Sequence, residues 1–158
     1  MKQKDTLVNE LVFLLEKGNA HATFEAATAG IPAALRSKRP DPLPYSIWEL
    51  VEHIRISQWD IVEFCLSDKY ESPEWPKAYW PGAVETVSDQ QWEEALEQVR
   101  QDRERFIALL RREESDLFTP FSYGTGQNLL REALLIADHT AYHTGEMLVL
   151  RRLLGCWP

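Results

Sequence analysis

The residues whose types and spacing could do chemistry are histidines in the last part of the chain. His139 and His143 lie four residues apart in a segment whose apolar residues recur every three or four positions. In a helix this spacing places both side chains on one face, one turn apart, which suits two imidazoles that bind one metal ion. His143 lies within the apolar stripe and His139 borders it. Buried imidazole nitrogens are costly without partners, and a bound metal ion would satisfy both of them.

A third histidine lies on another segment of helical periodicity. His53 borders the apolar face of that segment, next to Ile54 and one turn from Leu50. If the two segments face each other, three imidazoles meet, and three protein ligands with one open position are typical of catalytic metal sites. The alternative is that each histidine is a core residue that hydrogen-bonds a backbone carbonyl. His21 lies in a predicted loop and has no partner at ligand spacing.

Four long amphipathic segments must position these histidines. They cover approximately residues 5–17, 46–67, 88–114 and 128–154, and a shorter helical piece is predicted at 23–29. Two of the long segments begin with a capping box, Ser46 with Glu49 and Ser88 with Gln91. No alternating run is long enough to indicate a strand. The pattern predicts an all-α protein, a single four-helix-bundle domain over residues 1–158 with long crossover connections.

The segment at 68–87 is predicted to be a long loop that is rich in large aromatic residues. Trp75, Tyr79 and Trp80 lie there among three prolines and a glycine. Loops of this length inside a compact domain are often functional, so these side chains could line a substrate pocket. We favour the interpretation that the aromatic rings anchor the crossover to the bundle.

Composition excludes several classes of function. The chain has 158 residues, a formal net charge of −8 and a sequence pI near 5.0. This acidic balance argues against a nucleic-acid binder that neutralises phosphates and against a basic membrane-surface helix. No apolar run approaches the roughly 20 residues that span a bilayer, and the start of the chain does not resemble a signal peptide. Cys65 and Cys156 are too few for a disulfide framework, and we expect a reducing cytoplasm.

The two cysteines are also weak candidates for the site. Cys65 follows Phe64 in a predicted helix and is expected to be a small core residue. Cys156 lies beyond the last predicted helix, which is an unfavourable position for a nucleophile.

Three parts of the chain together resemble the DinB-like (damage-inducible) superfamily of metal-binding four-helix bundles. The first is residues 46–54, with Trp59 and Asp60 following, and the second is residues 72–81 with Trp75, Tyr79 and Trp80. The third is the run DHTAYHTGE at 138–146, which leads into LRRLLG at 150–155. The resemblance covers most of the chain and is far more specific than any single histidine.

The resemblance implies a histidine triad of His53, His139 and His143 at one end of the bundle core, a divalent ion that is typically nickel or zinc, and often a homodimer. Relatives include thiol S-transferases that use bacillithiol or mycothiol, and a maleylpyruvate isomerase. One departure is Glu146, where many relatives are expected to have glutamine.

Two functions follow as alternatives. The first is a metal-dependent enzyme that transfers a low-molecular-weight thiol to a small-molecule substrate, with catalytic residues still unknown. Asp60, Tyr142 and Glu146 are candidates for orienting the metal ligands. For Asp60, a role on the helix surface or as a helix cap is at least as good an expectation. For Tyr142 and Glu146, a simple surface contact is the better expectation. The second is a non-enzymatic, metal-stabilised dimer that binds a partner or a small ligand. Exposed apolar residues on the first and third long helices would mark its interface.

Overall fold

The computed structural model describes residues 2–157, and within that range the protein is helical and has no strand. The fold class predicted from the sequence is therefore confirmed. The elements in chain order are α1 (Lys2–Lys17), α2 (Phe24–Thr28), α3 (Ala33–Arg36), α4 (Ile47–Leu66), the 3₁₀ helix η1 (Lys77–Tyr79), α5 (Asp89–Arg111) and α6 (Leu129–Leu153).

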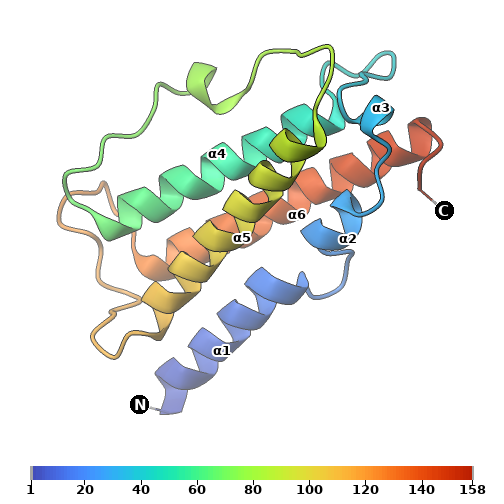
Figure 1. Cartoon of the computed structure of the whole chain (residues 1–158). Coiled ribbons are helices and arrows are strands. Elements are labelled where there is room, and N and C mark those ends of the chain that lie inside the picture. The colour runs from blue at the N-terminus through green and yellow to red at the C-terminus, as the bar shows by residue number, and fades with distance from the viewer. Residues whose placement is uncertain (1, 158) are drawn as a thin grey trace.

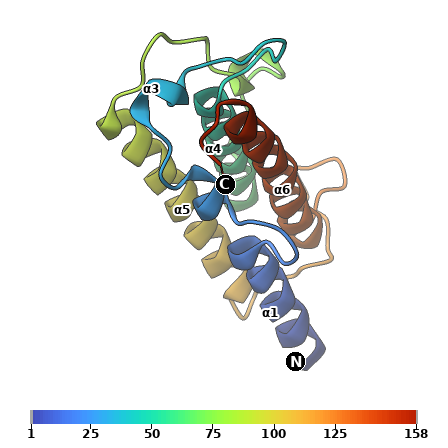
Figure 2. The same ribbon diagram turned by 90° about the vertical axis from the view of Figure 1, so that its right-hand side faces the viewer.

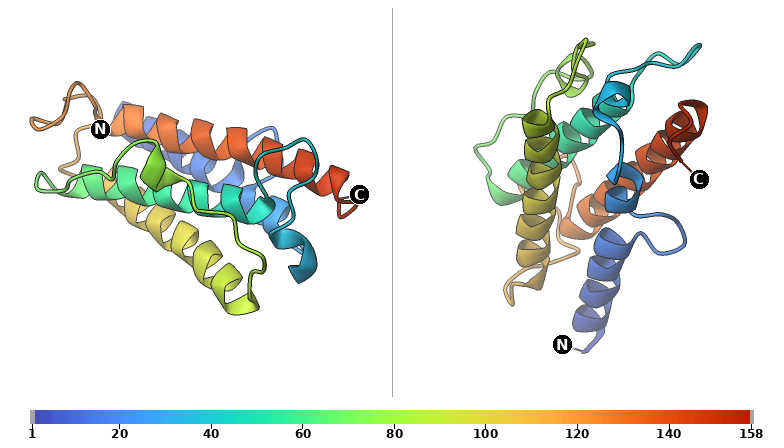
Figure 3. Two further views of the ribbon diagram at one scale, coloured as in Figure 1. Left: turned by 90° about the horizontal axis from the view of Figure 1, so that it is seen from above. Right: turned by 45° about the vertical axis from the view of Figure 1, so that its right-hand side comes forward.

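The four long helices α1, α4, α5 and α6 form the bundle (Figure 1). Helices α4 and α5 pack side by side and run in the same direction, whereas α6 packs against α4 and runs the opposite way. Helix α1 is shorter and packs on α5 and α6 toward one end of the bundle, and α2 and α3 lie toward the other end (Figure 2). Because α4 and α5 are parallel, the chain must run back along the length of the bundle after α4 ends and before α5 begins. The segment at 67–88 makes this crossing and passes over α4 (Figure 3, left).

The core consists of two apolar clusters, one toward each end of the bundle. One joins α1 to the end of α4, the end of α5 and the start of α6, with Phe106 and Leu110 fully buried in it. The other joins α2 to the start of α4, the start of α5 and the end of α6, with Leu50 and Met147 at its centre. Each cluster contains the same end of α4 and α5 and the opposite end of α6, because α4 and α5 are parallel and α6 is antiparallel to them.

The starts of α4, α5 and α6 agree with the sequence predictions because they depend on local chemistry, whereas α1 begins at Lys2, three residues before the predicted 5. In both predicted capping boxes, the Ser46 and Ser88 hydroxyls accept a hydrogen bond from the backbone N–H of the N3 residue. Asn128 caps α6 by accepting from the N–H of Arg131. The ends of the long helices agree to within one residue except in α5, which ends at Arg111, three residues before the predicted 114, where Arg112 becomes extended. The short elements α3 and η1 were not predicted.

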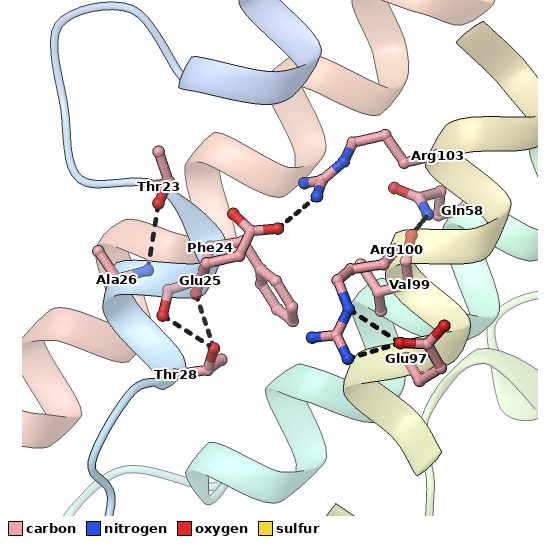
Figure 4. A network of polar contacts seen from close by, with 10 residues as sticks. All are labelled: Thr23, Phe24, Glu25, Ala26, Thr28, Gln58, Glu97, Val99, Arg100 and Arg103. Carbon is pink, nitrogen blue, oxygen red and sulfur yellow. Dashed lines mark hydrogen bonds and ion pairs between the residues drawn. The ribbon is translucent and has the colours of Figure 1, made fainter. Parts of the chain in front are cut away.

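Polar contacts fix the smaller elements and join the helices (Figure 4). Thr23 caps α2, and Glu25 of α2 forms an ion pair with Arg103 of α5. The side-chain amide of Gln58 on α4 donates to the backbone carbonyl of Val99 on α5 over 2.7 Å. Because Gln58 is buried, this bond links the two parallel helices inside the core.

Across residues 2–157, no helix combines the length and the apolar character that crossing a membrane requires.

Candidate metal centre

The three histidines singled out in the sequence meet between the two apolar clusters. His53 lies on α4, and His139 and His143 lie one turn apart near the middle of α6. His139 is one turn from Ile136 of the first cluster, and His143 is one turn from Met147 of the second. The resemblance implied a site at one end of the core. The structure instead places His139 and His143 near the middle of α6 and His53 in the second turn of α4.

The geometry of the triad suits a single ion. Ring centroids are 4.8 Å apart for His53 and His139, 4.7 Å for His53 and His143, and 4.5 Å for His139 and His143. One possible ligand atom from each histidine lies within 4.8 Å of the others, and no other group of three such residues occurs in the described part of the chain. The Nε2 atoms of His53 and His139 are 3.0 Å apart. Two nitrogens bound to one tetrahedral zinc ion would lie about 3.4 Å apart, so little movement is needed.

The remaining nitrogens of two rings are held by protein groups. Nδ1 of His53 lies 2.8 Å from the backbone carbonyl oxygen of Tyr79. Nδ1 of His143 lies 2.6 Å from Oε2 of Glu146. A carbonyl or carboxylate oxygen accepts a hydrogen bond only from a protonated Nδ1, so each contact favours the tautomer with a free lone pair on Nε2. This is the arrangement that metal-binding histidines require.

Burial favours the neutral form of two of the imidazoles, His53 and His139. Burial lowers the pKa of His53 below its ordinary value, although the hydrogen bond to the Tyr79 carbonyl acts in the opposite direction. Burial, with smaller contributions from His143 and His53, lowers the pKa of His139 to about 3. Neutral rings have lone pairs to donate at pH 7, and three neutral ligands would leave the double charge of a bound cation undiminished. The residues present therefore fit a divalent metal ion.

Aromatic side chains cover one side of the triad. The Trp80 ring stacks on His53 with centroids 3.9 Å apart and an interplanar angle of 7°. Tyr45, which precedes α4, stacks on the far side of Trp80 at 6.1 Å, and its hydroxyl donates to Oε1 of Glu146 over 2.8 Å. Burial and the Glu146 contact raise the pKa of Tyr45 to about 12, so the phenol keeps the proton that it donates. The roles of Tyr45 and of the Tyr79 carbonyl were not predicted.

The three residues considered as candidates for orienting the metal ligands differ in what they contact. Glu146 contacts His143 directly, so the expected surface role was wrong for this residue. Asp60 contacts none of the three imidazoles through a hydrogen bond; it accepts from the Tyr79 hydroxyl over 2.7 Å and thus holds the residue whose carbonyl contacts His53. Tyr142 is 64% exposed and lies edge-on to His143 at 4.9 Å. Its side chain is therefore mainly a surface group, as expected.

Only some of the aromatic residues in the loop at 68–87 anchor this crossover to the bundle. Tyr79 is buried and Trp80 is half-buried against the triad, which confirms the anchoring interpretation for these two residues. Trp75 is 68% exposed, which contradicts that interpretation for Trp75. Trp75 contacts the Tyr79 ring edge-on at 5.0 Å, and both side chains line a cleft beside His139.

This cleft, here called the Trp75 cleft, adjoins the histidine triad. It has a volume of about 310 Å³ and is lined by Ser57, Asp60, Ile61, Trp75, Tyr79, Leu135 and His139. The size falls at the lower end of the range for small-molecule sites. A ligand in this cleft would lie against a side chain of the candidate metal centre.

The free cysteines do not take part in the triad. Cys65 is buried in the first apolar cluster, as predicted, and burial raises the pKa of its thiol. Cys156 follows the end of α6 and is half-buried.

Comparison with known proteins agrees with these observations. A family model described as the DinB superfamily matches residues 19–147, which include all three histidines. Searches of curated proteins and of solved structures gave no match. The family model covers most of the chain, and the helical bundle with its histidine triad fits that family, so the chain belongs to the DinB superfamily.

Proposed function

We propose that His53, His139 and His143 bind one divalent metal ion, nickel or zinc, and that the protein is a metal-dependent thiol S-transferase. The observation that carries this proposal is the convergence of three imidazoles, two with Nδ1 engaged by protein oxygens, beside a cleft that could hold a small molecule. When bound, such a cation would act as a Lewis acid and lower the pKa of a coordinated thiol.

The proposed reaction joins a low-molecular-weight thiol to an electrophilic carbon. The thiol gives up its proton to the medium, its sulfur forms the new bond to carbon, and the leaving group departs with the electron pair of the broken bond. The chain's own part is to hold the imidazole tautomers through Tyr79 and Glu146 and to shield His53 from water with Trp80. Activity on such thiols would place the protein in the reducing cytoplasm.

The test is thiol consumption by the purified, metal-loaded protein. Bacillithiol, mycothiol and simpler thiols would each be mixed with 1-chloro-2,4-dinitrobenzene, and loss of free thiol followed against the uncatalysed rate. We expect turnover by the wild type and by His21→Ala, whose histidine lies outside the site, and none by His143→Ala. If the folded, loaded wild type does not exceed the uncatalysed rate with any thiol, the transferase proposal fails.

A second proposal concerns assembly, because an uncovered apolar stripe runs along α6. Tyr142 and Val149 lie seven residues apart, so they share one face of the helix, and Leu153 lies on the same face one turn further along. All three are exposed. We expected exposed apolar residues on the first and third long helices, but α1 contributes Phe13 alone among the large exposed hydrophobic residues described, and α5 contributes none. We propose that the α6 stripe is the interface of a homodimer.

A further inference from the structure

The Trp75 cleft has features of a binding site that the triad alone does not explain. We infer that it binds a small, neutral, aromatic molecule that donates one hydrogen bond to Asp60. The role of this molecule as the electrophilic substrate rests on the proposed function, whereas its binding does not.

The walls of the cleft favour an aromatic ligand. Ile61, Leu135, Trp75 and Tyr79 supply apolar surface, and the two aromatic rings meet edge-on at 5.0 Å. Trp75 is the most exposed large apolar side chain described in the protein. A flat ring bound beside it would remove apolar surface from water and gain aromatic contacts with both rings.

The polar end of the cleft favours a hydrogen-bond donor. Oδ2 of Asp60 accepts from the Tyr79 hydroxyl, but Oδ1 is buried and has no hydrogen-bond partner. The Ser57 hydroxyl, on a side chain that is 6% exposed, is also buried without a partner. The Tyr70 hydroxyl lies near Asp60 and interacts with its carboxylate, but it is outside hydrogen-bonding geometry, so both the hydroxyl and Oδ1 stay without a partner. Buried acceptors without partners are costly, and a ligand hydroxyl would supply the missing donor.

The charges around the cleft select a neutral ligand. No lysine or arginine lines it, and the Asp60 carboxylate would repel an anion. Glu132 is buried close enough to Asp60 for the two carboxyl groups to interact unfavourably, which adds to that repulsion. An ammonium group would lose its hydration against four apolar side chains, and this loss costs more than that of a neutral hydroxyl.

One residue links the cleft to the triad. The Tyr79 hydroxyl donates to Asp60, while the Tyr79 backbone carbonyl contacts Nδ1 of His53. His139 itself forms part of the cleft wall. A molecule bound at Asp60 would therefore lie against the candidate metal centre.

The test compares four ligands that share one ring: 4-methylphenol, 4-methylanisole, 4-methylbenzoate and 4-methylbenzylamine. Binding to the metal-free and the metal-loaded protein would be measured by titration in NMR spectra. Since a hydrogen bond to a carboxylate is among the stronger ones, we expect 4-methylphenol to bind at least about tenfold more tightly than the anisole. Equal binding of the phenol and the anisole, or tightest binding of the benzoate or the amine, would overturn the assignment.

Two substitutions sharpen the test. In Asp60→Asn the amide oxygen can still accept from Tyr79, while the free position becomes a donor, so the preference should reverse toward the anisole. Trp75→Ala should weaken phenol binding roughly threefold to tenfold through the lost ring contacts. Phe118→Ala, which removes another highly exposed aromatic ring that lies outside the cleft, should leave binding unchanged. An unchanged ligand preference in folded Asp60→Asn would refute the role of Asp60.

The binding measurements separate this inference from the proposed function. Phenol binding without thiol transfer would discard the transferase proposal and keep the cleft. Thiol transfer without this pattern of binding would keep the transferase and discard the cleft as described.

Discussion

Glu146 lies three residues after His143 on α6, and its Oε2 atom is 2.6 Å from Nδ1 of the His143 ring. The other carboxylate oxygen accepts from the Tyr45 hydroxyl, so the carboxylate is held from two directions. A carboxylate on the outer nitrogen of a metal-binding histidine fixes the tautomer and raises the basicity of the other nitrogen. Glu146, which stands where many relatives are expected to have glutamine, is therefore the residue that holds the His143 ring.

The first prediction concerns the charge of Glu146. Glu146→Gln keeps an acceptor for His143 but removes the negative charge, so metal affinity should fall roughly tenfold. Competition with a chelator of known affinity measures the change. Glu10→Gln, an exposed position on α1, is the matched control and should bind metal like the wild type. Equal affinities in Glu146→Gln and the wild type would show that the carboxylate has no effect on the ligand.

The second prediction compares two tryptophans of the same loop. Trp80→Ala removes the ring stacked on His53 and should lower the free energy of unfolding by about 1–3 kcal/mol. Trp75→Ala removes a ring that is 68% exposed and should change stability by less than about 0.5 kcal/mol. Urea unfolding of both variants is the measurement. Similar losses in the two variants would mean that the Trp80 stack is not a stabilising contact.

The third prediction concerns acid stability. Burial acts to raise the pKa of Glu49, but hydrogen bonds from Arg39 and Ser46 outweigh it, and the pKa is lowered from its ordinary value of 4.5. A carboxyl group with a lowered pKa in the folded state stabilises the protein above pH 4.5, and this contribution is lost as the pH falls through the lowered value.

Glu49→Gln keeps the capping box but removes the charge that pairs with Arg39. It should cost about 1 kcal/mol at pH 7 and progressively less below pH 4.5. Chemical unfolding over this pH range measures both values. A loss in Glu49→Gln that stays constant down to pH 2.5 would contradict the lowered pKa.

The fourth prediction tests the α6 stripe. Val149→Asp places a charge at its centre and should convert the proposed homodimer into a folded monomer in sedimentation experiments. Phe118→Asp, an exposed apolar position in the loop before α6, should leave the dimer intact. If the wild type is monomeric at all concentrations, the α6 stripe is not a dimer interface.

The sequence predicted the parts of this protein that depend on local patterns. The starts of α4, α5 and α6 follow from Ser46, Ser88 and Asn128, because a capping side chain bonds its own helix. The spacing of His139 and His143 likewise guarantees one helical face. These features could be predicted without knowing which helices pack together.

The parts that escaped prediction depend on contacts between distant segments. The partner of His53 is a backbone carbonyl of Tyr79, 26 residues away, and a carbonyl has no sequence signature. Tyr45 reaches Glu146 across 101 residues. The exposure of Trp75 beside buried Tyr79 follows from how the crossover lies on α4, which no periodic pattern in the loop records.

The most direct test of the central claim is to count the metal ions on the purified chain and identify their ligands. Elemental analysis with X-ray absorption spectroscopy should find one divalent ion per chain with three histidine nitrogens, for the wild type and for His21→Ala. His53→Ala, His139→Ala and His143→Ala should each lose most of the ion while staying folded by circular dichroism. A chain that binds no divalent ion, or one that keeps its ion after all three histidines are replaced, would contradict the account.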